Sequence, residues 1–313
     1  MLEKTQEKHI SVLLHELVDT ISLSPSKKDI VVDCTLGFGG HAKETIRKMK
    51  KGDMFIGFDA DEKNLNLAKD NLKHLVQEKQ IEAVFIHSNF VQLKEELEKR
   101  NIDSLSFIYY DLGISSMQID EGERGFSFKN DGPLDMRFDK TKGKSAYEVV
   151  NFYEKEKLIK IFKEYGEENM ARRIAEKIET ERKKKKITTT KELSSLIESI
   201  KGDAKTKARI FQAIRIEVNN ELENIKISIR DAIKFLKKGG KIFVITFHSL
   251  EDRIVKNILR DESKDCICSE LICTCKHKKN IKILTKKPII PRNEEIKNNP
   301  RSRSAKARIG EKI

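Results

Sequence analysis

The first third of the chain alternates short apolar runs with longer segments of helical periodicity. The apolar runs are Ile30–Asp33, Met54–Asp59, Ala83–His87 and Leu105–Asp111, and three of them end in an aspartate. Strands separated by helices of this length indicate βαβ units, a parallel sheet and right-handed crossovers. The alternation therefore predicts an α/β fold with a Rossmann-like sheet.

A glycine-rich turn follows the first strand. Asp33 ends this strand, Gly37, Gly39 and Gly40 lie in the turn, and a helical segment begins after His41. Glycine permits positive φ angles and lets a ligand approach the backbone closely. Ligands of open α/β sheets bind beyond the carboxyl ends of strands, where the strand order reverses. By itself, the turn is also consistent with an ordinary tight strand–helix connection.

The alternation stops after the fourth strand. Between 118 and 206 no buried strand is evident, and a capping box at Thr189 and Glu192 starts one of several charged helices. We therefore expect a helical insertion over 118–206, within a sheet domain formed by 1–117 and 207–313.

The sheet pattern returns after the insertion. One long helix is expected over 208–236, followed by strands over 241–247 and 281–285. The basic tail, 299–309, is expected to add a last strand at the edge of the sheet.

The chain carries a large excess of positive charge. Its 313 residues include 63 Lys and Arg against 50 Asp and Glu, which gives a net charge of +13. This excess favours a polyanionic partner, most simply nucleic acid, although a coding bias toward lysine would also produce it. No apolar run is long enough to cross a bilayer, and the polar start of the chain lacks a signal-peptide core. We therefore expect a cytoplasmic protein that does not contact a membrane.

The acids at the strand ends narrow the choice of ligand. The dinucleotide fingerprint G-x-G-x-x-G has its third glycine where the helix packs closely against the strand, and this turn has no glycine at that position. Asp59 ends the second strand, and its carboxylate could accept hydrogen bonds from both hydroxyls of a ribose. Asp33, Asp59 and Asp111 should line the same rim of a parallel sheet, whereas a single such acid is often only a helix cap. The pattern favours a nucleoside cofactor, either a nicotinamide dinucleotide or S-adenosylmethionine.

Several sequence blocks resemble those of the RsmH (MraW) family of bacterial ribosomal RNA methyltransferases. The turn Asp33-x-Thr35-x-Gly37-x-Gly39-Gly40-His41 is similar to the cofactor loop of that family. Further similar blocks follow in the same order, and they lie at 111–116, 125–128, 132–137, 209–222, 247–253 and 299–302. Together they span nearly the whole chain. One departure is Met117, where the family usually has proline.

The resemblance implies a function and a set of site residues. The family uses S-adenosylmethionine to methylate the exocyclic N4 of a cytidine in 16S ribosomal RNA of the small subunit. By resemblance, the cofactor would contact Gly39, Gly40, His41, Asp59 (ribose), Phe90 (adenine), Asp111 and Gln118. The oligomeric state is left open, with a homodimer among the alternatives.

Cytosine N4 is a weak nucleophile because its lone pair is shared with the ring, so a protein acceptor must engage the amine. We hypothesise that Asp111, or a neighbouring main-chain carbonyl, is this acceptor and that His248 and Ser249 lie close to the base. The alternative role of His248-Ser249 is a helix N-cap.

The RNA itself would be held by basic surfaces, with the target base turned out of its stack. The helical insertion and the tail residues Arg301, Arg303, Lys306 and Arg308 are the candidates for this contact. The run 183–186 is strongly basic but equally fits a solvated helix end.

Four of the five cysteines cluster late in the chain, at Cys266, Cys268, Cys273 and Cys275. An odd count in a protein that is not secreted argues against a disulfide framework. The spacing would allow a structural zinc ion, although structural sites more often use C-x₂₋₄-C pairs. A loop of reduced thiols is the alternative, and no metal is assigned to the reaction.

Three other functions share part of this sequence pattern. A DNA amino-methyltransferase would share the cofactor, but the chain lacks the Pro-Pro-aromatic loop after the fourth strand and a target-recognition domain. An RNA-binding or ribosome-assembly protein with an inactive pocket would not need the intact turn and Asp59. An NAD-dependent oxidoreductase would need the third glycine and a His/Arg pair for hydride transfer.

Overall fold

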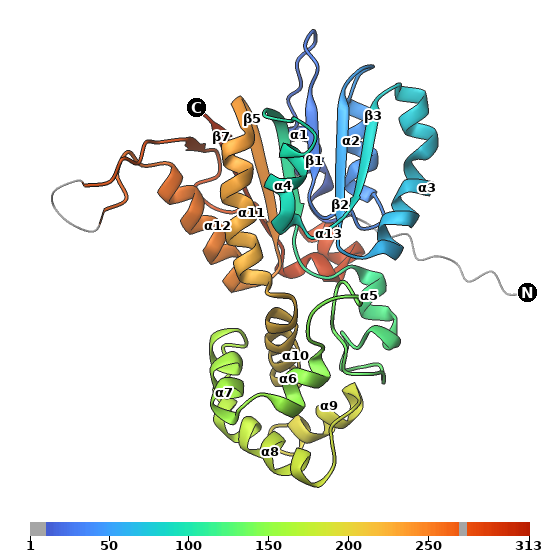
Figure 1. The fold of residues 1–313 in the computed structure, drawn as a ribbon, viewed down its shortest axis with the longest axis vertical. Coiled ribbons are helices and arrows are strands. Elements are labelled where there is room, and N and C mark those ends of the chain that lie inside the picture. Colours follow the sequence, from blue (N-terminus) through green and yellow to red (C-terminus); the bar gives the residue numbers. More distant parts are fainter. Residues whose placement is uncertain (1–10, 269–273) are drawn as a thin grey trace, which may run out of the picture. The chain divides into compact units, whose positions relative to one another are not determined.

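The computed structural model describes residues 11–268 and 274–313, and these form two compact units. The sheet unit comprises Met1–Gly113 and Leu222–Ile313, and the helical unit comprises Ile114–Glu221 (Figure 1). The sequence placed the second boundary earlier, at 206/207. Helix α10 (Ala204–Asn219) contributes Ile210, Phe211 and Ile214 to the core of the helical unit, which is why the boundary lies beyond this helix.

The sheet unit is built on seven strands in the order β3-β2-β1-β4-β5-β7-β6. The strands are β1 (Ile30–Asp33), β2 (Met54–Asp59), β3 (Glu82–His87), β4 (Leu105–Asp111), β5 (Leu236–Thr246), β6 (Ile281–Ile283) and β7 (Lys306–Lys312). The neighbouring strands β3, β2, β1, β4 and β5 pair in parallel. Strand β7 runs antiparallel to both of its neighbours, β5 and β6. The chain order reverses between β1 and β4, so the predicted Rossmann-like sheet is confirmed, with its switch point beside the glycine-rich turn.

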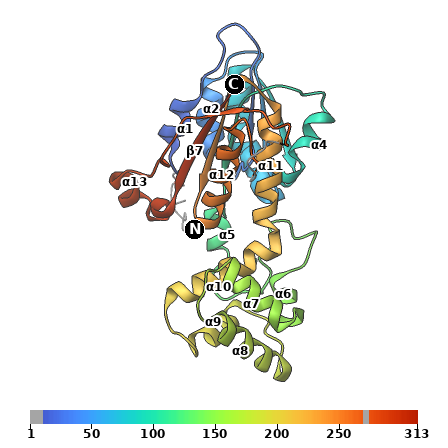
Figure 2. The same ribbon diagram turned by 90° about the vertical axis from the view of Figure 1, so that its left-hand side faces the viewer.

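Helices cover both faces of the sheet (Figures 1 and 2). One face packs against α1 (Leu14–Thr20), α2 (Gly40–Lys48) and α3 (Glu62–Lys79). The other face packs against α4 (Leu93–Glu98), α11 (Glu221–Phe235) and α12 (Ser249–Glu262). Short helices η1 (Phe90–Gln92), α13 (Asn293–Asn298) and η3 (Pro300–Ser304) complete the unit. The buried central strands explain the continuous apolar runs of the sequence.

Two expectations about the second half of the chain were wrong. The tail does not form the edge of the sheet, because β7 lies between β5 and β6. The expected helix over 208–236 is two helices, α10 (Ala204–Asn219) and α11. Asn220 ends α10 in the left-handed region, with φ 50° and ψ 37°, a conformation that asparagine tolerates better than most residues.

The helical unit packs its helices around a core of its own. These helices are α5 (Ser116–Asp120), η2 (Gly122–Arg124), α6 (Ala146–Phe152), α7 (Lys155–Glu164), α8 (Ala171–Lys184), α9 (Thr190–Glu198) and α10. The predicted capping box of Thr189 and Glu192 is confirmed at the start of α9.

Polar side chains fix the long loop of the helical unit between η2 and α6. Arg124 donates to the carbonyls of Arg137 and Phe138, each at 3.0 Å. Asn219 donates to the carbonyl of Met136 at 2.7 Å and accepts from the amide of Phe138 at 2.8 Å. Two family-like blocks of the sequence therefore meet in one hydrogen-bonded network.

Across the described residues, no helix is both long and apolar enough to cross a membrane.

Candidate cofactor site at the carboxyl edge of the sheet

The glycine-rich turn has a backbone that only glycine adopts easily. Gly37 and Gly39 have φ angles of 54° and 82°, in the left-handed region. A Cβ on Gly39 would lie 3.0 Å from Leu72 Cδ1, and a Cβ on Gly40 would collide with the hydroxyl of Ser11. These glycines therefore let the first turn of α2 pack against α3 and the segment before α1. The turn also exposes backbone N–H groups at the start of a helix, where they can bind polar ligand atoms.

Asp59 connects the turn to the end of β2. Its Oδ2 accepts from the amide of Gly37 at 2.8 Å, and its Oδ1 accepts from the amide of Asp61 at 2.8 Å. Burial raises the pKa of this carboxyl to about 7, although both backbone hydrogen bonds act to lower it. Each carboxylate oxygen keeps a second lone pair, so Asp59 can still accept hydrogen bonds from a pair of hydroxyls.

Asp111 lies across the switch point from the turn, at the end of β4. Its backbone amide donates to Thr35 Oγ1 at 2.6 Å, which ties the two strand ends together. Its Oδ2 lies 3.6 Å from His41 Nδ1. Burial, and then the charge of Glu251, raise the pKa of the Asp111 carboxyl to about 7.

His41 is buried at the start of α2. Its Nε2 lies 2.9 Å from the carbonyl of Val12, an acceptor, so the ring proton is assigned to Nε2. Burial lowers the pKa of His41, which keeps the ring neutral and leaves the Nδ1 lone pair facing Asp111. A neutral ring in this tautomer favours Asp111 in its protonated form.

Two carboxyl oxygens at this edge are buried without a partner. Within residues 11–268 and 274–313, Asp33 Oδ2 and Asp111 Oδ1 find no hydrogen bond. Burial raises the pKa of Asp33 to about 6. Unpartnered buried acceptors are rare in folded proteins and call for an explanation. Donor groups on a ligand, such as hydroxyl or ammonium groups, would satisfy them, so the site fits a polar nucleoside cofactor.

Phe90 provides an aromatic surface beside the acids. It begins η1, directly after β3, and its ring packs edge-on against Tyr110 with centroids 5.7 Å apart. The Asn89 side chain accepts from the amide of Val91 at 3.0 Å and so starts the helix that holds Phe90 in place. A half-buried ring at the end of β3 is suited to contact a flat heterocycle.

Gln118 belongs to the helical unit, in α5. It is buried, and its Oε1 accepts from the amide of Ser115 at 3.2 Å. Because the other candidate residues lie in the sheet unit, the role of Gln118 toward the cofactor stays a prediction.

His248 caps a helix, as one of the two sequence interpretations proposed. Its Nδ1 accepts from the amide of Glu251 at 3.5 Å, and Glu251 Oε2 accepts from the amide of His248 at 3.2 Å. The His248 Nε2 lies 3.1 Å from Glu251 Oε1. Both ring nitrogens thus lie close to Glu251, but among the described residues Nε2 makes no hydrogen bond, so a role of His248 toward the substrate stays a prediction.

A cavity of about 310 Å³ lies next to this cap, entirely within the sheet unit. Phe247, His248 and Ser249 line it from the junction of β5 and α12, and Arg303 and Lys306 line it from the tail. Since Asp111 pairs with Ile245 of β5, the cavity adjoins the strand that neighbours the acid. Its mixture of aromatic, hydroxyl and cationic groups suits a nucleotide.

The turn, the three acids and the late blocks all agree with one protein family. The profile of the MraW methylase family matches residues 6–313. The chain belongs to the MraW methylase family. Membership covers both units, so the helical unit is part of the family architecture.

Relatives within the MraW family are similar over their full length. The chain is 48% identical over 316 residues to ribosomal RNA small subunit methyltransferase H of Clostridioides difficile, covering 97% of this chain and 99% of the relative. It is 47% identical to the protein of that name in Caldicellulosiruptor saccharolyticus, over 97% of this chain and 99% of the relative. Among solved structures, an rRNA methylase from Streptococcus thermophilus aligns at 10% identity with a TM-score of 0.46, covering 97% of this chain and 99% of that one.

One of the expected RNA-contacting residues of this MraW-family chain is engaged elsewhere. Arg308 is buried and makes a two-pronged ion pair with Asp252, at 2.6 Å from Nε to Oδ1 and 3.0 Å from Nη2 to Oδ2. It therefore stabilises the contact between β7 and α12. Arg303 is exposed, and it remains a candidate for contacting phosphate.

The basic run 183–186 is a helix end, as its alternative interpretation held. Lys184 pairs with Glu181 at 3.0 Å, and Lys185 pairs with Glu192 at 2.8 Å. Lys186 lies 4.8 Å above the ring of Phe152. Lys184, Lys185 and Lys186 therefore each contact a neighbouring side chain of the helical unit.

Two residues that shape the site were quoted in the family-like blocks but given no role. Thr35 holds the end of β4, and Glu251 both caps α12 and raises the pKa of Asp111. Their contacts join strands and helices that are remote in sequence. The capping spacing from His248 to Glu251 was the only local signal for either one.

Proposed function

We propose that this protein transfers a methyl group from S-adenosylmethionine to the exocyclic N4 of a cytidine in 16S ribosomal RNA. Membership of the MraW methylase family supports methyl transfer, and the names of the relatives support small-subunit ribosomal RNA as substrate. The reaction would take place in the cytoplasm, on RNA within the small subunit.

The observation that carries the proposal is the row of buried acids at the switch point, with an unpartnered oxygen on Asp111 beside the turn. A structural acid would have its oxygens paired, as Asp29 does: Oδ1 accepts from Lys237 at 2.6 Å and Oδ2 from the amide of Ser24 at 2.6 Å. Asp111 keeps one buried oxygen without a hydrogen-bond partner, at the place where ligands bind in such sheets.

The residues of the turn would hold the cofactor. Gly39 and Gly40 let the turn pack against Leu72 and Ser11, so that its backbone can face the cofactor, and His41 fixes the start of α2. Asp59 would accept hydrogen bonds from the ribose hydroxyls, and Phe90 would lie against the adenine. This distribution follows the family resemblance and agrees with the donors, acceptors and ring present at each position. By resemblance, Gln118 would also contact the cofactor.

The reaction is an in-line displacement, in which alignment contributes most of the rate. When bound, S-adenosylmethionine supplies an electrophilic methyl group on a sulfonium. Transfer of this methyl group to N4 would leave the bonding electron pair on sulfur and would require N4 to lose one proton, so the part of the protein would be to align N4 and to accept that proton. Asp111 Oδ1 would accept a hydrogen bond from N4 and then take up this proton. A carboxyl with a pKa of about 7 is suited to accept and release a proton near neutral pH.

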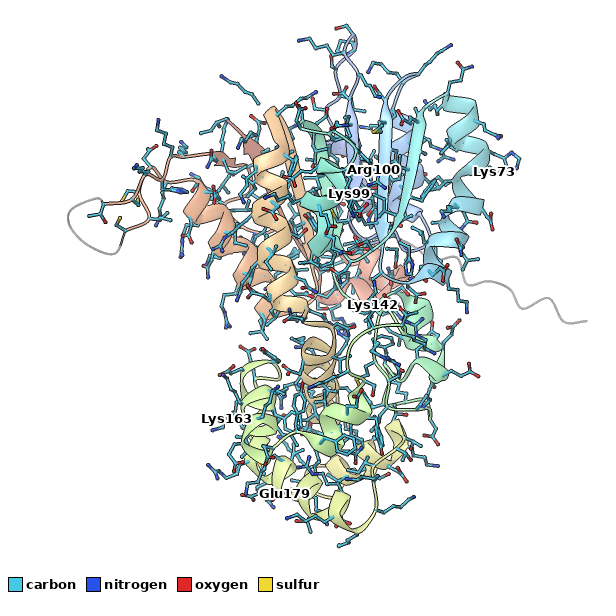
Figure 3. The ribbon with its side chains drawn as sticks, viewed as in Figure 1. Lys73, Lys99, Arg100, Lys142, Lys163 and Glu179 are labelled. Atoms are coloured by element: carbon cyan, nitrogen blue, oxygen red, sulfur yellow. The ribbon has the colours of Figure 1, made fainter. Side chains whose placement is uncertain are left out.

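The RNA would contact the cavity beside His248 and the exposed cations of both units. Lys73 of the sheet unit and Lys163 of the helical unit both extend into solvent (Figure 3). The target base would be turned out of its stack, because an enzyme cannot reach N4 within a helix. We propose that the helical unit supplies part of the recognition surface.

The proposal for Asp111 is tested by Asp111→Asn, which keeps the shape of the side chain but cannot take up a proton. We expect methylation of 16S ribosomal RNA to fall at least about 100-fold, the usual contribution of a general base. Calorimetry with S-adenosylhomocysteine should show binding within about tenfold of the unmodified protein. Full methylation by Asp111→Asn with normal cofactor binding would refute this role and leave the family assignment intact.

A further inference from the structure

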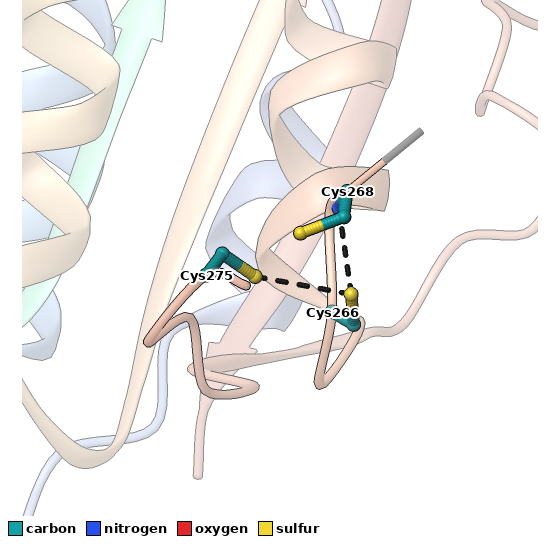
Figure 4. Close-up of side chains that lie close together, drawn as sticks. All are labelled: Cys266, Cys268 and Cys275. Atoms are coloured by element: carbon teal, nitrogen blue, oxygen red, sulfur yellow. Dashed lines mark hydrogen bonds between the residues drawn. The ribbon is translucent and has the colours of Figure 1, made fainter. Parts of the chain in front are cut away.

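A cluster of three cysteines lies outside the site described above. Cys266 and Cys268 follow α12, and Cys275 precedes β6 (Figure 4). Their three Sγ atoms all lie within 4.8 Å of one another, and the Sγ atoms of Cys266 and Cys275 are 3.8 Å apart. Cys273, the fourth cysteine that the sequence singled out, lies outside the described residues.

This spacing of the sulfurs is that of a metal site. Zinc–sulfur bonds of about 2.3 Å in a tetrahedron place two sulfurs about 3.8 Å apart. A disulfide would need a separation of about 2.05 Å, much shorter than the 3.8 Å between Cys266 and Cys275. Three converging thiols cannot all be paired with one another as disulfides, whereas one zinc ion can bind all three.

A backbone amide within the cluster is directed at one of the sulfurs. The amide of Cys268 donates to Cys266 Sγ at 3.4 Å, a contact typical of a thiolate ligand. Exposed lysines at 264, 276, 278 and 279 are close to these cysteines in the sequence, and their charge would offset the negative charge that three thiolates and one zinc ion leave. The Nε2 of His277 lies 3.1 Å from the carbonyl of Asp261, and His277 is not part of the cluster.

The loop that carries the thiols needs a cross-link. In its described part, 263–268 and 274–280, it has no strand and contributes no residue to the hydrophobic core. The base of the loop is closed by Asn280, which donates from its amide to the carbonyl of Glu262 at 2.8 Å and from its side chain to the Glu262 carboxylate at 3.0 Å. A loop of this length without a core is otherwise disordered or tied by a ligand.

We propose that Cys266, Cys268 and Cys275 bind one structural zinc ion that holds this loop together. Each thiol releases its proton to solvent as its sulfur–zinc bond forms, so no oxidant or reductant is required. The ion takes no part in methyl transfer, because its ligands lie in the α12–β6 loop and not at the carboxyl edge of the parallel strands.

Metal analysis tests the proposal. The full chain is purified under reducing conditions without chelator, from cells grown with added zinc, and its metal content is measured by mass spectrometry. We expect about one zinc per chain, at least about tenfold less in Cys266→Ser and Cys275→Ser, and full content in Lys276→Ala, an exposed control in the same loop. Zinc-free wild-type protein, or full zinc in both serine variants, would overturn the site.

Cobalt substitution tests the site in the wild-type protein, so its result does not depend on whether the serine variants fold. Wild-type protein loaded with cobalt(II) should show thiolate-to-cobalt charge transfer and the intense visible bands of tetrahedral sulfur coordination. Absence of these bands would contradict the proposal. So would an intact mass, measured without reductant, that is lower by two hydrogens, because that loss marks a disulfide.

Discussion

The carboxyl group of Asp111, at the end of β4, destabilises the folded protein when it is charged, because it is buried. Asp111 has a pKa of about 7 in the folded chain, well above the value of about 4 expected when it is unfolded. The folded state therefore binds more protons than the unfolded state between these values, and stability falls as the pH rises through this window. Above about pH 7 the full loss of folding stability is present, because the buried Asp111 carboxylate is charged and is repelled by the charge of Glu251.

Asp111→Asn should therefore stabilise the free protein. The variant removes a buried charge, and its amide can donate to His41 Nδ1, which lies 3.6 Å from Oδ2 in the native protein. We expect the free energy of unfolding to rise by about 1–2 kcal/mol near pH 8 and by little near pH 4. Urea unfolding at the two pH values checks this. An equal effect at both would mean that the carboxyl has an ordinary pKa.

The glycines of the turn allow a matched comparison. Gly39 and Gly52 have φ angles of 82° and 85°, so alanine should cost about 1 kcal/mol of stability at either position through the backbone alone. Only at Gly39 would the new Cβ also press on Leu72, since nothing lies within 4 Å of a Cβ on Gly52. Gly39→Ala should lose most of its affinity for S-adenosylhomocysteine, whereas Gly52→Ala should bind normally. Calorimetry on both variants decides between these outcomes, and equal affinities would show that the turn is not the cofactor contact.

At the scale of elements, the break between α10 and α11 depends on one residue. Asn220 takes a left-handed conformation with φ 50°, and its amide donates to the carbonyl of Ile216 or Glu217. Asn220→Gly should leave stability nearly unchanged, whereas Asn220→Val should cost about 1–2 kcal/mol, because a β-branched side chain clashes in this conformation. Urea unfolding of the two variants provides the measurement. Equal stability of the two variants would contradict a left-handed conformation at this position.

The same elements show what the sequence could predict. Strands β1, β2, β3 and β4 were located to within a residue or two, because each is a buried apolar run of a parallel sheet. The helix break at Asn220 was missed, since asparagine is common both inside helices and at their ends. The position of β7 between β5 and β6 was also missed, because pairing between strands distant in sequence leaves no local pattern.

The candidate site was predictable in part, for the same reason. The acids at the strand ends and the glycines follow directly from local sequence, and the structure brings Asp59 to the amide of Gly37. Contacts such as His41 with Val12 and Asp111 with Thr35 join separate elements and could not be anticipated. Arg308 looked like an RNA contact because its pairing with Asp252 is invisible in the sequence.

At the scale of the whole molecule, the net charge of +13 predicts RNA binding that weakens steeply with salt. Arg303→Ala should reduce the slope of log affinity against log salt by about one, because an exposed cation at the cavity is lost. Arg308→Ala should leave the slope unchanged and lower stability instead, since it breaks the ion pair with Asp252. Filter binding to 16S ribosomal RNA at several salt concentrations, with thermal unfolding of both variants, distinguishes them. Equal slopes for wild type and Arg303→Ala would remove Arg303 from the interface.

The proposed reaction forms one bond, between a methyl carbon and N4 of a cytidine. Small subunits from cells that lack this protein would be incubated with the purified chain and S-adenosylmethionine, and their 16S ribosomal RNA digested and mapped by mass spectrometry. We expect N4-methylcytidine at a single site with the native protein and none with Asp59→Asn. Methylation on carbon rather than on N4, or no methylation of the small-subunit RNA, would contradict it.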